Sequence, residues 1–396
     1  MVYFFTILLL LVLILCYDIN GKKLYRNECY LFVLVIFIMI AGLRWRVMVD
    51  TPNYIYNFYH VYPSLEEFSF VDYPIGKDPF YVLINSLVIS LGGRFYWVQL
   101  IEASFVNILV FKYFKRHSNS IFTCLFFYYI TCYFGYSMET MRASFTFAIC
   151  LYANDYILEK KWIKGYLLLL LAIMFHAQAI VMLVVPVLFF LRFNKLGLVA
   201  CIAAFFLGYF IQKGLGDYIN LLELSDSISD KASRYAESDQ YGSQAGNFNF
   251  FIVKIFPNIF YSFFCFFYLK KYYLYSSKVL KIEPFIMCGI FFLIVQMNLQ
   301  IAYRYVDYFR LYFVILYAEV FIMIMHNSKN LSRSLASLRA LLAFLPFFLL
   351  VGYSKYLSLY TFYPYSSVIE RSINREREWK YGHTNKVTPS ADVNEY

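Results

Sequence analysis

Long apolar runs recur along the chain and most strongly limit what it can fold into. Residues 2–17, 30–43, 95–111, 121–138 and 309–325 contain few or no charged side chains. Each run is close to the roughly 20 residues that an α-helix needs to cross a bilayer. Backbone groups in lipid must form their hydrogen bonds within the segment, so helices are the expected spanning structure. The runs therefore predict an all-α, polytopic membrane protein.

Composition excludes the main soluble classes. Of the 396 residues, 61% are hydrophobic and 15% are charged, whereas an ordinary soluble domain has roughly 25% charged residues. The chain is too apolar for a soluble enzyme or a disordered protein. None of its eight cysteines forms a C-x-x-C pair, so we expect small buried residues rather than disulfides or metal ligands. The first apolar run has no basic leader or small-residue cleavage site, which predicts no cleavable signal peptide.

The distribution of charge predicts a topology. A net charge of +10 would suggest nucleic-acid binding in a soluble protein, but here the basic residues lie in short connections between apolar runs. This is the positive-inside pattern, so no nucleic-acid partner is expected and the basic connections are assigned to the cytoplasm. Two long loops, 44–78 and 212–249, carry more acidic than basic residues and are assigned outside. The count is about twelve crossings, with both termini outside.

Three segments need separate treatment. The run from 80 to 91 would span about 18 Å as a helix, which is too short to cross a bilayer, and Gly92-Gly93 follows it. We expect a re-entrant or interfacial helix there. Residues 166–191 have basic residues at both ends, so they form either one tilted helix or, as we prefer, a hairpin that turns near His176. Residues 1–365 are predicted to form one transmembrane domain, and residues 366–396 a polar, disordered tail.

The predicted topology gathers polar residues at the outer ends of helices, which indicates an outward-facing polar cavity. The first patch contains Arg44, Arg46, Asp50, Thr51 and Tyr54. Paired guanidinium groups can hold a phosphate in a bidentate way. The alternative is that the arginines only reach the interface, while the Asp-Thr-Pro step starts a helix.

The next two patches are shorter. Glu139 and Arg142 lie in a tight turn between two apolar runs, either as part of a site or as a structural pair at i, i+3 spacing. His176 would lie at the tip of the predicted hairpin, where an imidazole could transfer a proton near neutral pH or simply stabilise the turn. Glu102 and Glu319 lie inside apolar runs, either as partners of an Arg or Tyr or as a proton relay.

The fourth patch contains Tyr303, Arg304, Asp307 and Arg310. Its charged residues repeat at i, i+3 spacing and so could form ion pairs along one helix face. Its aromatic residues suit either a lipid-interface belt or a sugar-stacking surface.

These patches, taken in order, resemble the EpsG family of polytopic proteins, which is grouped with Wzy-type polymerases of exopolysaccharide, capsule and O-antigen. The matching elements are Arg44-Trp45 through Asp50-Thr51 and Tyr54, Asp78-Pro79-Phe80, Met141-Arg142, Phe175-His176 through Ala179, Tyr303-Arg304 with Tyr308-Phe309, and Tyr363-Pro364-Tyr365. Four positions depart from the family pattern. Met48 replaces a Gly, Phe80 follows Pro79 without the usual Gly, Ala143 replaces a Gln and Gln178 replaces a Ser.

The resemblance implies glycosyl transfer on the outer face of the bacterial cytoplasmic membrane. A glycan on undecaprenyl diphosphate would move onto a sugar hydroxyl of another lipid-linked repeat unit, without a cofactor or metal. The residues expected on the departing diphosphate are Arg44, Arg46, Arg142, Arg304 and Arg310. His176 is the expected base, with Asp50 in reserve, and Glu139, Asp307, Thr51, Tyr54 and Tyr303 are expected to support them. Membrane lipid, a chain-length regulator and a flippase are the candidate partners.

Three other functions would use similar residues. A flippase or other transporter of lipid-linked oligosaccharide would also gather arginines in a cavity, although no internal repeat is evident. A glycan-modifying acyltransferase could use His176 on an acyl donor. A ligase that joins a glycan to a lipid acceptor would share most of the site.

Overall fold

The computed structural model describes residues 1–221, 251–272, 277–299, 302–326 and 333–372. Across these residues the chain is helical, and its only β pairing is an isolated antiparallel bridge between Arg44 and Ser367. The fold therefore confirms the predicted all-α class. The chain forms two compact units, 1–186 with 355–396 and 187–354. The single transmembrane domain over 1–365 stays a prediction.

The first unit contains most of the predicted site. Its elements are α1 (Val2–Leu13), η1 (Ile14–Ile19), α2 (Arg26–Gly42), α3 (Thr51–His60), η2 (Ile75–Lys77), α4 (Pro79–Ser90), α5 (Phe95–His117), α6 (Ile121–Tyr128), η3 (Tyr129–Tyr133), η4 (Gly135–Glu139), α7 (Met141–Leu158), α8 (Trp162–Phe175) and η5 (Ala177–Leu183). The stretch Val185–Leu188 follows as a 3-10 turn, and α17 (Leu359–Phe362) returns to this unit from the C-terminal side.

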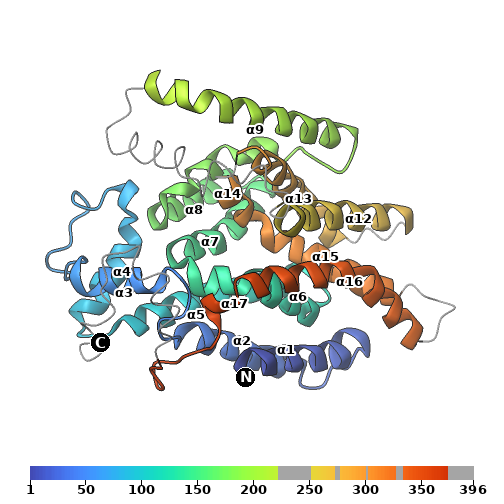
Figure 1. The fold of residues 1–396 in the computed structure, drawn as a ribbon, viewed down its shortest axis with the longest axis horizontal. Coiled ribbons are helices and arrows are strands. Elements are labelled where there is room, and N and C mark those ends of the chain that lie inside the picture. Colours follow the sequence, from blue (N-terminus) through green and yellow to red (C-terminus); the bar gives the residue numbers. More distant parts are fainter. Residues whose placement is uncertain (222–250, 273–276, 300–301, 327–332, 373–396) are drawn as a thin grey trace. The chain divides into compact units, whose positions relative to one another are not determined.

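Helices α5 and α7 form the centre of the first unit, with α2 packed on α5 and α8 packed on α7 (Figure 1). Gly42 at the end of α2 permits the close approach to α5. A Cβ at this position would lie 2.5 Å from a side-chain carbon of Leu100 and 3.1 Å from its Cα. This contact fixes the loop that follows α2, and therefore Arg44, against the start of α5.

Two predicted breaks are present in the structure. Helix α4 is a separate helix of 12 residues, which ends before Gly92 with its φ of +67°. Helix α8 ends at Phe175, His176 is extended, and η5 then packs back along α8. The Tyr166 hydroxyl of α8 donates a hydrogen bond to the Leu183 carbonyl at 3.4 Å. The hairpin that turns at His176 is therefore confirmed.

The second unit contains α9 (Lys195–Leu221), η8 (Phe251–Ile255), α12 (Phe256–Tyr272), α13 (Ser277–Gln296), α14 (Tyr303–Val306), η10 (Asp307–Phe309), α15 (Arg310–His326) and most of α16 (Arg333–Leu357). Helix α15 is its central helix, because nearly all its side chains are buried. Helix α13 packs against both α9 and α15, and α12 packs against α15. Glu283 of α13 accepts the backbone N–H of Phe193 at 2.7 Å.

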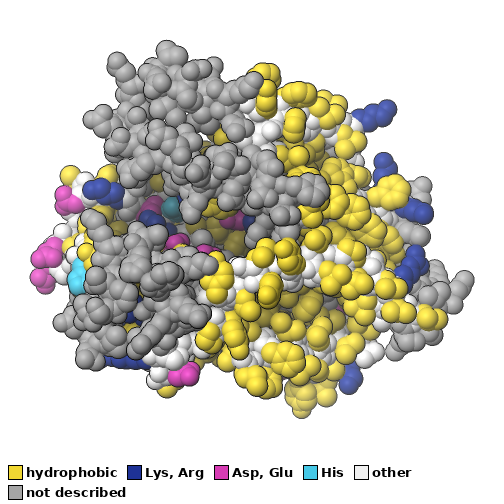
Figure 2. Space-filling view, in the orientation of Figure 1, with side chains coloured by type: hydrophobic (Ala, Val, Ile, Leu, Met, Phe, Trp, Pro, Cys, Tyr) yellow, Lys and Arg dark blue, Asp and Glu magenta, His cyan; other side chains and the backbone are white. Residues whose placement is uncertain are grey.

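The helices have the dimensions and surfaces of a membrane protein. Among the residues that the structure describes, four helical segments are long and apolar enough to cross a bilayer: Val2–Ile19, Phe95–His117, Tyr303–His326 and Leu335–Leu357. Shorter apolar helices include Pro79–Ser90 and Trp162–Phe175. Hydrophobic side chains cover the exposed sides of the helices in Figure 2, as expected for lipid contact. The count of twelve crossings and the outward cavity remain predictions.

The two predicted polar segments are described only in part. Helix α9 continues to Leu221, past the predicted start of the 212–249 loop, and 222–250 lie outside the described residues. The tail begins with residues that pair with the loop after α2. Trp45 N–H donates to the Ser366 carbonyl at 2.8 Å, and Val368 N–H donates to the Leu43 carbonyl at 2.9 Å. Residues 373–396 lie outside the described residues.

Candidate active site

Asp78 connects the residues of the candidate active site. It is the N-cap of α4, directly before Pro79, and its φ of +53° is tolerated more readily by Asp than by most residues. Its carboxylate is almost fully buried and accepts from Arg142 Nη1 at 2.7 Å and from the Ala177 N–H at 3.0 Å. His176 Nδ1 lies 3.3 Å from both of its oxygens. We call Asp78, Arg142 and His176 the Asp78 cluster.

His176 is positioned by the break after α8. Its backbone is extended, with φ −156° and ψ 116°, so the chain leaves the helix and the ring turns toward Asp78. The next residue, Ala177, begins η5, and its free N–H meets the same carboxylate. The side chain is 17% exposed, so part of the ring remains accessible. The Phe-His step therefore places an imidazole at the edge of the helix pair, as expected.

Arg142 lies in the first turn of α7, after a short turn centred on Thr140. Its guanidinium lies over the Tyr54 ring at 5.7 Å from the centroid, which is favourable cation–π geometry. Its side chain is 41% exposed, and within the described residues its Nε has no hydrogen-bond partner. Arg142 therefore keeps donors for a ligand while Asp78 fixes its position.

The electrostatics keep Asp78 ionised. Burial is the largest influence and acts to raise the pKa of the Asp78 carboxyl. The hydrogen bond from His176, the charge of Arg142 and the Ala177 N–H together hold that pKa below its usual value. An ionised Asp78 favours the His176 tautomer with the proton on Nδ1. The other ring nitrogen, Nε2, can then accept a proton.

The first predicted patch follows α2. Arg44 is fully buried and donates to the carbonyls of Ala41 and Ser137. Arg46 has a left-handed backbone with φ +50°. Asp50 is the N-cap of α3 but forms no side-chain cap hydrogen bond, and the buried Thr51 instead donates to the Val47 carbonyl. The predicted helix start is confirmed, and it places Asp50 one turn before Tyr54.

The remaining predicted residues occupy different positions. Glu139 ends η4, just before α7, and Arg142 forms an ion pair with Asp78. Tyr303, Arg304, Asp307 and Arg310 belong to the second unit. There Arg310 pairs with Asp307, and Arg304 Nε donates to the Tyr303 hydroxyl at 3.2 Å. The structure therefore assembles Arg142, His176 and Tyr54 around Asp78, whereas the fourth patch forms local contacts of its own.

Sequence reasoning did not include Asp78 among the site residues. The available signal was an acidic residue placed directly before a helix-starting Pro and at the end of a long polar loop. That pattern is typical of an N-cap, so it does not distinguish a cap from a functional carboxylate. Only the packing of α4 against α8 shows that Asp78 faces His176.

A comparison with known protein families shows to which family this chain belongs. A sequence model of the EpsG family matches residues 27–367. The chain belongs to the EpsG family. EpsG proteins are a Wzy-like polymerase family, and the match includes the Asp78 cluster and the Arg44 loop. Neither the curated proteins nor the solved structures contain a match to this chain.

Family membership gives a physical meaning to one departure from the EpsG pattern. Met48 stands where that pattern has Gly, and its φ is +74°. Glycine adopts this left-handed conformation without cost, whereas a residue with a side chain is strained there. The backbone shape explains the family's Gly, and in this chain the Met48 N–H is held by the Thr361 carbonyl at 2.8 Å.

Proposed function

We propose that this protein is a polysaccharide polymerase that joins undecaprenyl-diphosphate-linked repeat units on the outer face of the cytoplasmic membrane. The observation that carries the proposal is the Asp78 cluster, in which one buried carboxylate orients both a cation and an imidazole. Family membership supports a membrane protein of polysaccharide biosynthesis. Arg142 and His176 are the two groups of this cluster that we propose act on the substrate.

The proposed reaction is a displacement at the anomeric carbon of the donor glycan. The acceptor hydroxyl oxygen forms a bond to that carbon, and the bond from the carbon to the diphosphate oxygen breaks. The hydroxyl proton passes to His176 Nε2, while Asp78 stabilises the imidazolium through Nδ1. The bonding electrons leave with undecaprenyl diphosphate, and the exposed donors of Arg142 stabilise its growing charge.

Charge at the two ends of the same helices supports the orientation. Arg142 lies at the start of α7 and His176 at the end of α8, so the cluster occupies one end of this helix pair. Lys160, Lys161 and Lys164 lie at the opposite end, between or just inside the same helices. The positive-inside rule assigns the lysine end to the cytoplasm. The Asp78 cluster would then face outward, where lipid-linked repeat units are joined.

The test is the profile of lipid-linked glycans in a deletion strain that carries the wild type, Arg142→Ala or His176→Ala. We expect both variants to leave single repeat units on the outer-facing lipid and to lose long polymer. Repeat units that gather on the cytoplasmic side would instead indicate a flippase. Normal polymer that lacks a decoration would indicate an acyltransferase, and normal polymer that is not attached to its final lipid would indicate a ligase.

A further inference from the structure

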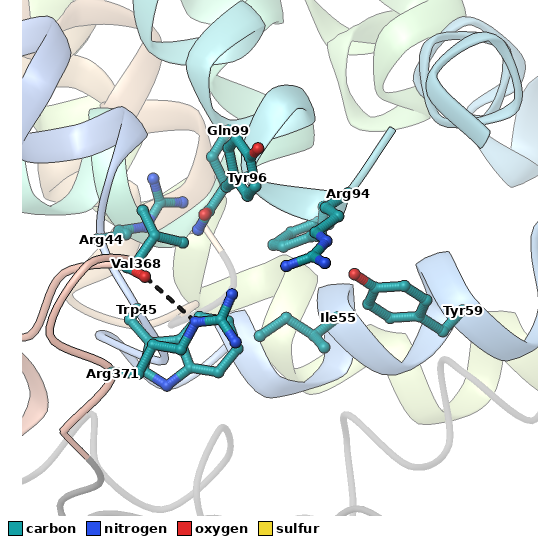
Figure 3. A pocket seen from close by; sticks show the side chains of 10 residues that line it. Arg44, Trp45, Ile55, Tyr59, Arg94, Tyr96, Gln99, Val368 and Arg371 are labelled. Atoms are coloured by element: carbon teal, nitrogen blue, oxygen red, sulfur yellow. Dashed lines mark hydrogen bonds between the residues drawn. The ribbon is translucent and has the colours of Figure 1, made fainter. Parts of the chain in front are cut away.

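A pocket lies in the first unit, where α2 ends and α5 begins (Figure 3). Arg44, two residues after α2, and Arg94, the residue before α5, both line it. Arg371 from the C-terminal segment lies on the same wall as Trp45. The pocket contains about 330 Å³ of empty space, part of it open solvent.

The buried walls of this pocket carry unpaired donors. Within the described part of the chain, Arg44 Nε and Nη2, Trp45 Nε1 and Gln99 Nε2 are buried and have no hydrogen-bond partner. Arg44 and Gln99 are themselves at least 98% buried. Buried polar groups are nearly always hydrogen-bonded, and an unmet donor costs about 1–3 kcal/mol. All these atoms are donors, so the partner they lack is an acceptor. Both carboxylate oxygens of Glu102, which acts on Arg44, are likewise buried without a hydrogen-bond partner among the described residues.

The charge of the pocket also favours an anion. Its lining includes three arginines and, among the described residues, no acidic side chain. Glu102, one turn after Gln99 in α5, supplies the negative charge that acts on Arg44. This single carboxylate can offset one of the three arginines. The first turn of the 23-residue helix α5 adds the positive end of its dipole. The pocket therefore keeps a positive potential.

Aromatic groups complete the pocket. The Arg371 guanidinium lies 5.3 Å from the centre of the Trp45 ring, and its Nε donates to the Val368 carbonyl at 3.2 Å. Tyr59 points toward Arg94 in Figure 3. Aromatic faces beside cations suit a sugar that is joined to an oxyanion. Donors, charge and aromatic faces thus point to one ligand class.

We propose that this pocket is a second oxyanion subsite, which holds the diphosphate of the acceptor lipid-linked repeat unit. The inference rests on the proposed polymerase function, which requires two lipid-linked substrates at once. Helix α3 separates the two sites: Tyr54 lies under Arg142, whereas Ile55 and Tyr59 line the pocket. The pocket also lies at the end of the membrane helix α5, the level expected for a lipid diphosphate.

The test measures binding of labelled citronellyl diphosphate to the full chain in nanodiscs. The background is Arg142→Ala, which disables the first site. We expect Arg94→Ala and Arg371→Ala each to weaken binding at least about tenfold. Gln99→Glu should weaken it more than Gln99→Leu, because the added charge repels the anion. The matched control is Lys112→Ala, an exposed cation about 27 Å along α5 from Arg94, which should bind normally. Melting temperatures verify that each variant is folded.

The possible results distinguish a failure of the second-subsite assignment from a failure of the proposed function. If Arg142→Ala alone abolishes binding and the pocket variants do not change it, the second subsite is wrong while the proposed function stands. If glucuronate competes better than inorganic diphosphate, the pocket holds an acidic sugar and the diphosphate assignment is overturned. If the pocket binds as expected but Arg142→Ala still makes polymer in cells, the proposed function fails and the anion-binding pocket remains.

Discussion

Two Asp–His–Arg clusters lie at opposite ends of α7, and they differ in which imidazole nitrogen contacts the carboxylate and in how far the ring is exposed. In the Asp78 cluster the carboxylate contacts His176 through Nδ1, which leaves Nε2 at a partly exposed edge. The other cluster contains Asp155, His117 and Arg116. There His117 Nε2 itself lies 2.7 Å from Asp155.

The environment of the Asp155 cluster is closed. The His117 ring stacks on Tyr113 with centroids 4.1 Å apart, and the Tyr113 hydroxyl donates to Asp155 at 3.0 Å. Only 6% of the His117 side chain is exposed. Arg116 shares its charge between Asp155 and Glu159. The comparison shows that residue types alone do not make a site: the nitrogen that is used and the access to the other one decide it.

The largest difference between the two clusters is expected when Asp78→Asn is compared with Asp155→Asn. Asp78→Asn removes the charge that fixes the His176 tautomer and holds Arg142, so polymer yield per folded molecule should fall on the order of 10²–10⁴-fold. Asp155→Asn should lower stability by about 1–3 kcal/mol with little change in that yield. Polymer is quantified against membrane protein content. Equal losses of yield in both variants would remove the distinction between the clusters.

A smaller effect is expected for Arg142→Lys against Arg116→Lys. Lysine keeps the charge but loses the planar fork that binds Asp78 and a diphosphate together, so activity should fall by about 10–100-fold. Arg116 is half exposed, so Arg116→Lys should change stability by less than about 1 kcal/mol and leave activity intact. Initial rates with lipid-linked substrate measure both. A fully active Arg142→Lys protein would show that a point charge suffices at the site.

Acid should affect the Asp78 cluster in a defined direction. Because the folded pKa of Asp78 is lowered, its ion pairs stabilise the protein above the unfolded pKa of about 3.9 and are lost as pH falls through the folded value. The wild type should therefore melt above Asp78→Asn at pH about 6, and the difference should shrink as the pH falls below about 3.9. Melting curves over this range measure it. A difference that grows with acid would contradict the assigned ion pairs.

The smallest expected effect concerns the loop beside the site. Met48 is buried, so Met48→Gly and Met48→Ala both lose its packing, at a cost of about 2–5 kcal/mol. Met48→Gly also relieves the left-handed strain at φ +74°, so it should be more stable than the matched control Met48→Ala by up to about 1 kcal/mol, after the entropy cost of Gly in the unfolded chain. Polymer yield per folded molecule should not differ between the two variants. A Met48→Gly variant that is no more stable than Met48→Ala would show that the backbone is not strained at this position.

The lengths of the apolar runs and the charges beside them were sufficient to predict the all-α class and two breaks between helices, but not the contacts of the site. The run from 80 to 91 was too short to span, and the break at His176 was marked by basic residues on both sides, so both features could be predicted. The partner of Arg142 could not be predicted in this way. Its ion pair is with Asp78, which lies 64 residues earlier in the sequence. Such a contact depends on the packing of α4 against α8, which local patterns do not encode.

The tail illustrates the same limit. Residues 366–372 are polar enough to suggest a solvated segment, but their backbone groups pair with Leu43 and Trp45. Arg371 thereby reaches the Trp45 ring. A pairing between residues more than 300 positions apart leaves no mark on the composition of either segment.

The most direct test of the central claim uses the purified protein in nanodiscs with lipid-linked repeat units as the only substrate. We predict that the wild type forms linked repeat units and releases undecaprenyl diphosphate in equal amount, and that His176→Ala and Arg142→Ala form neither product. A folded wild-type protein that forms no linked units, while the same preparation in vesicles moves the substrate across the bilayer, would contradict the polymerase assignment.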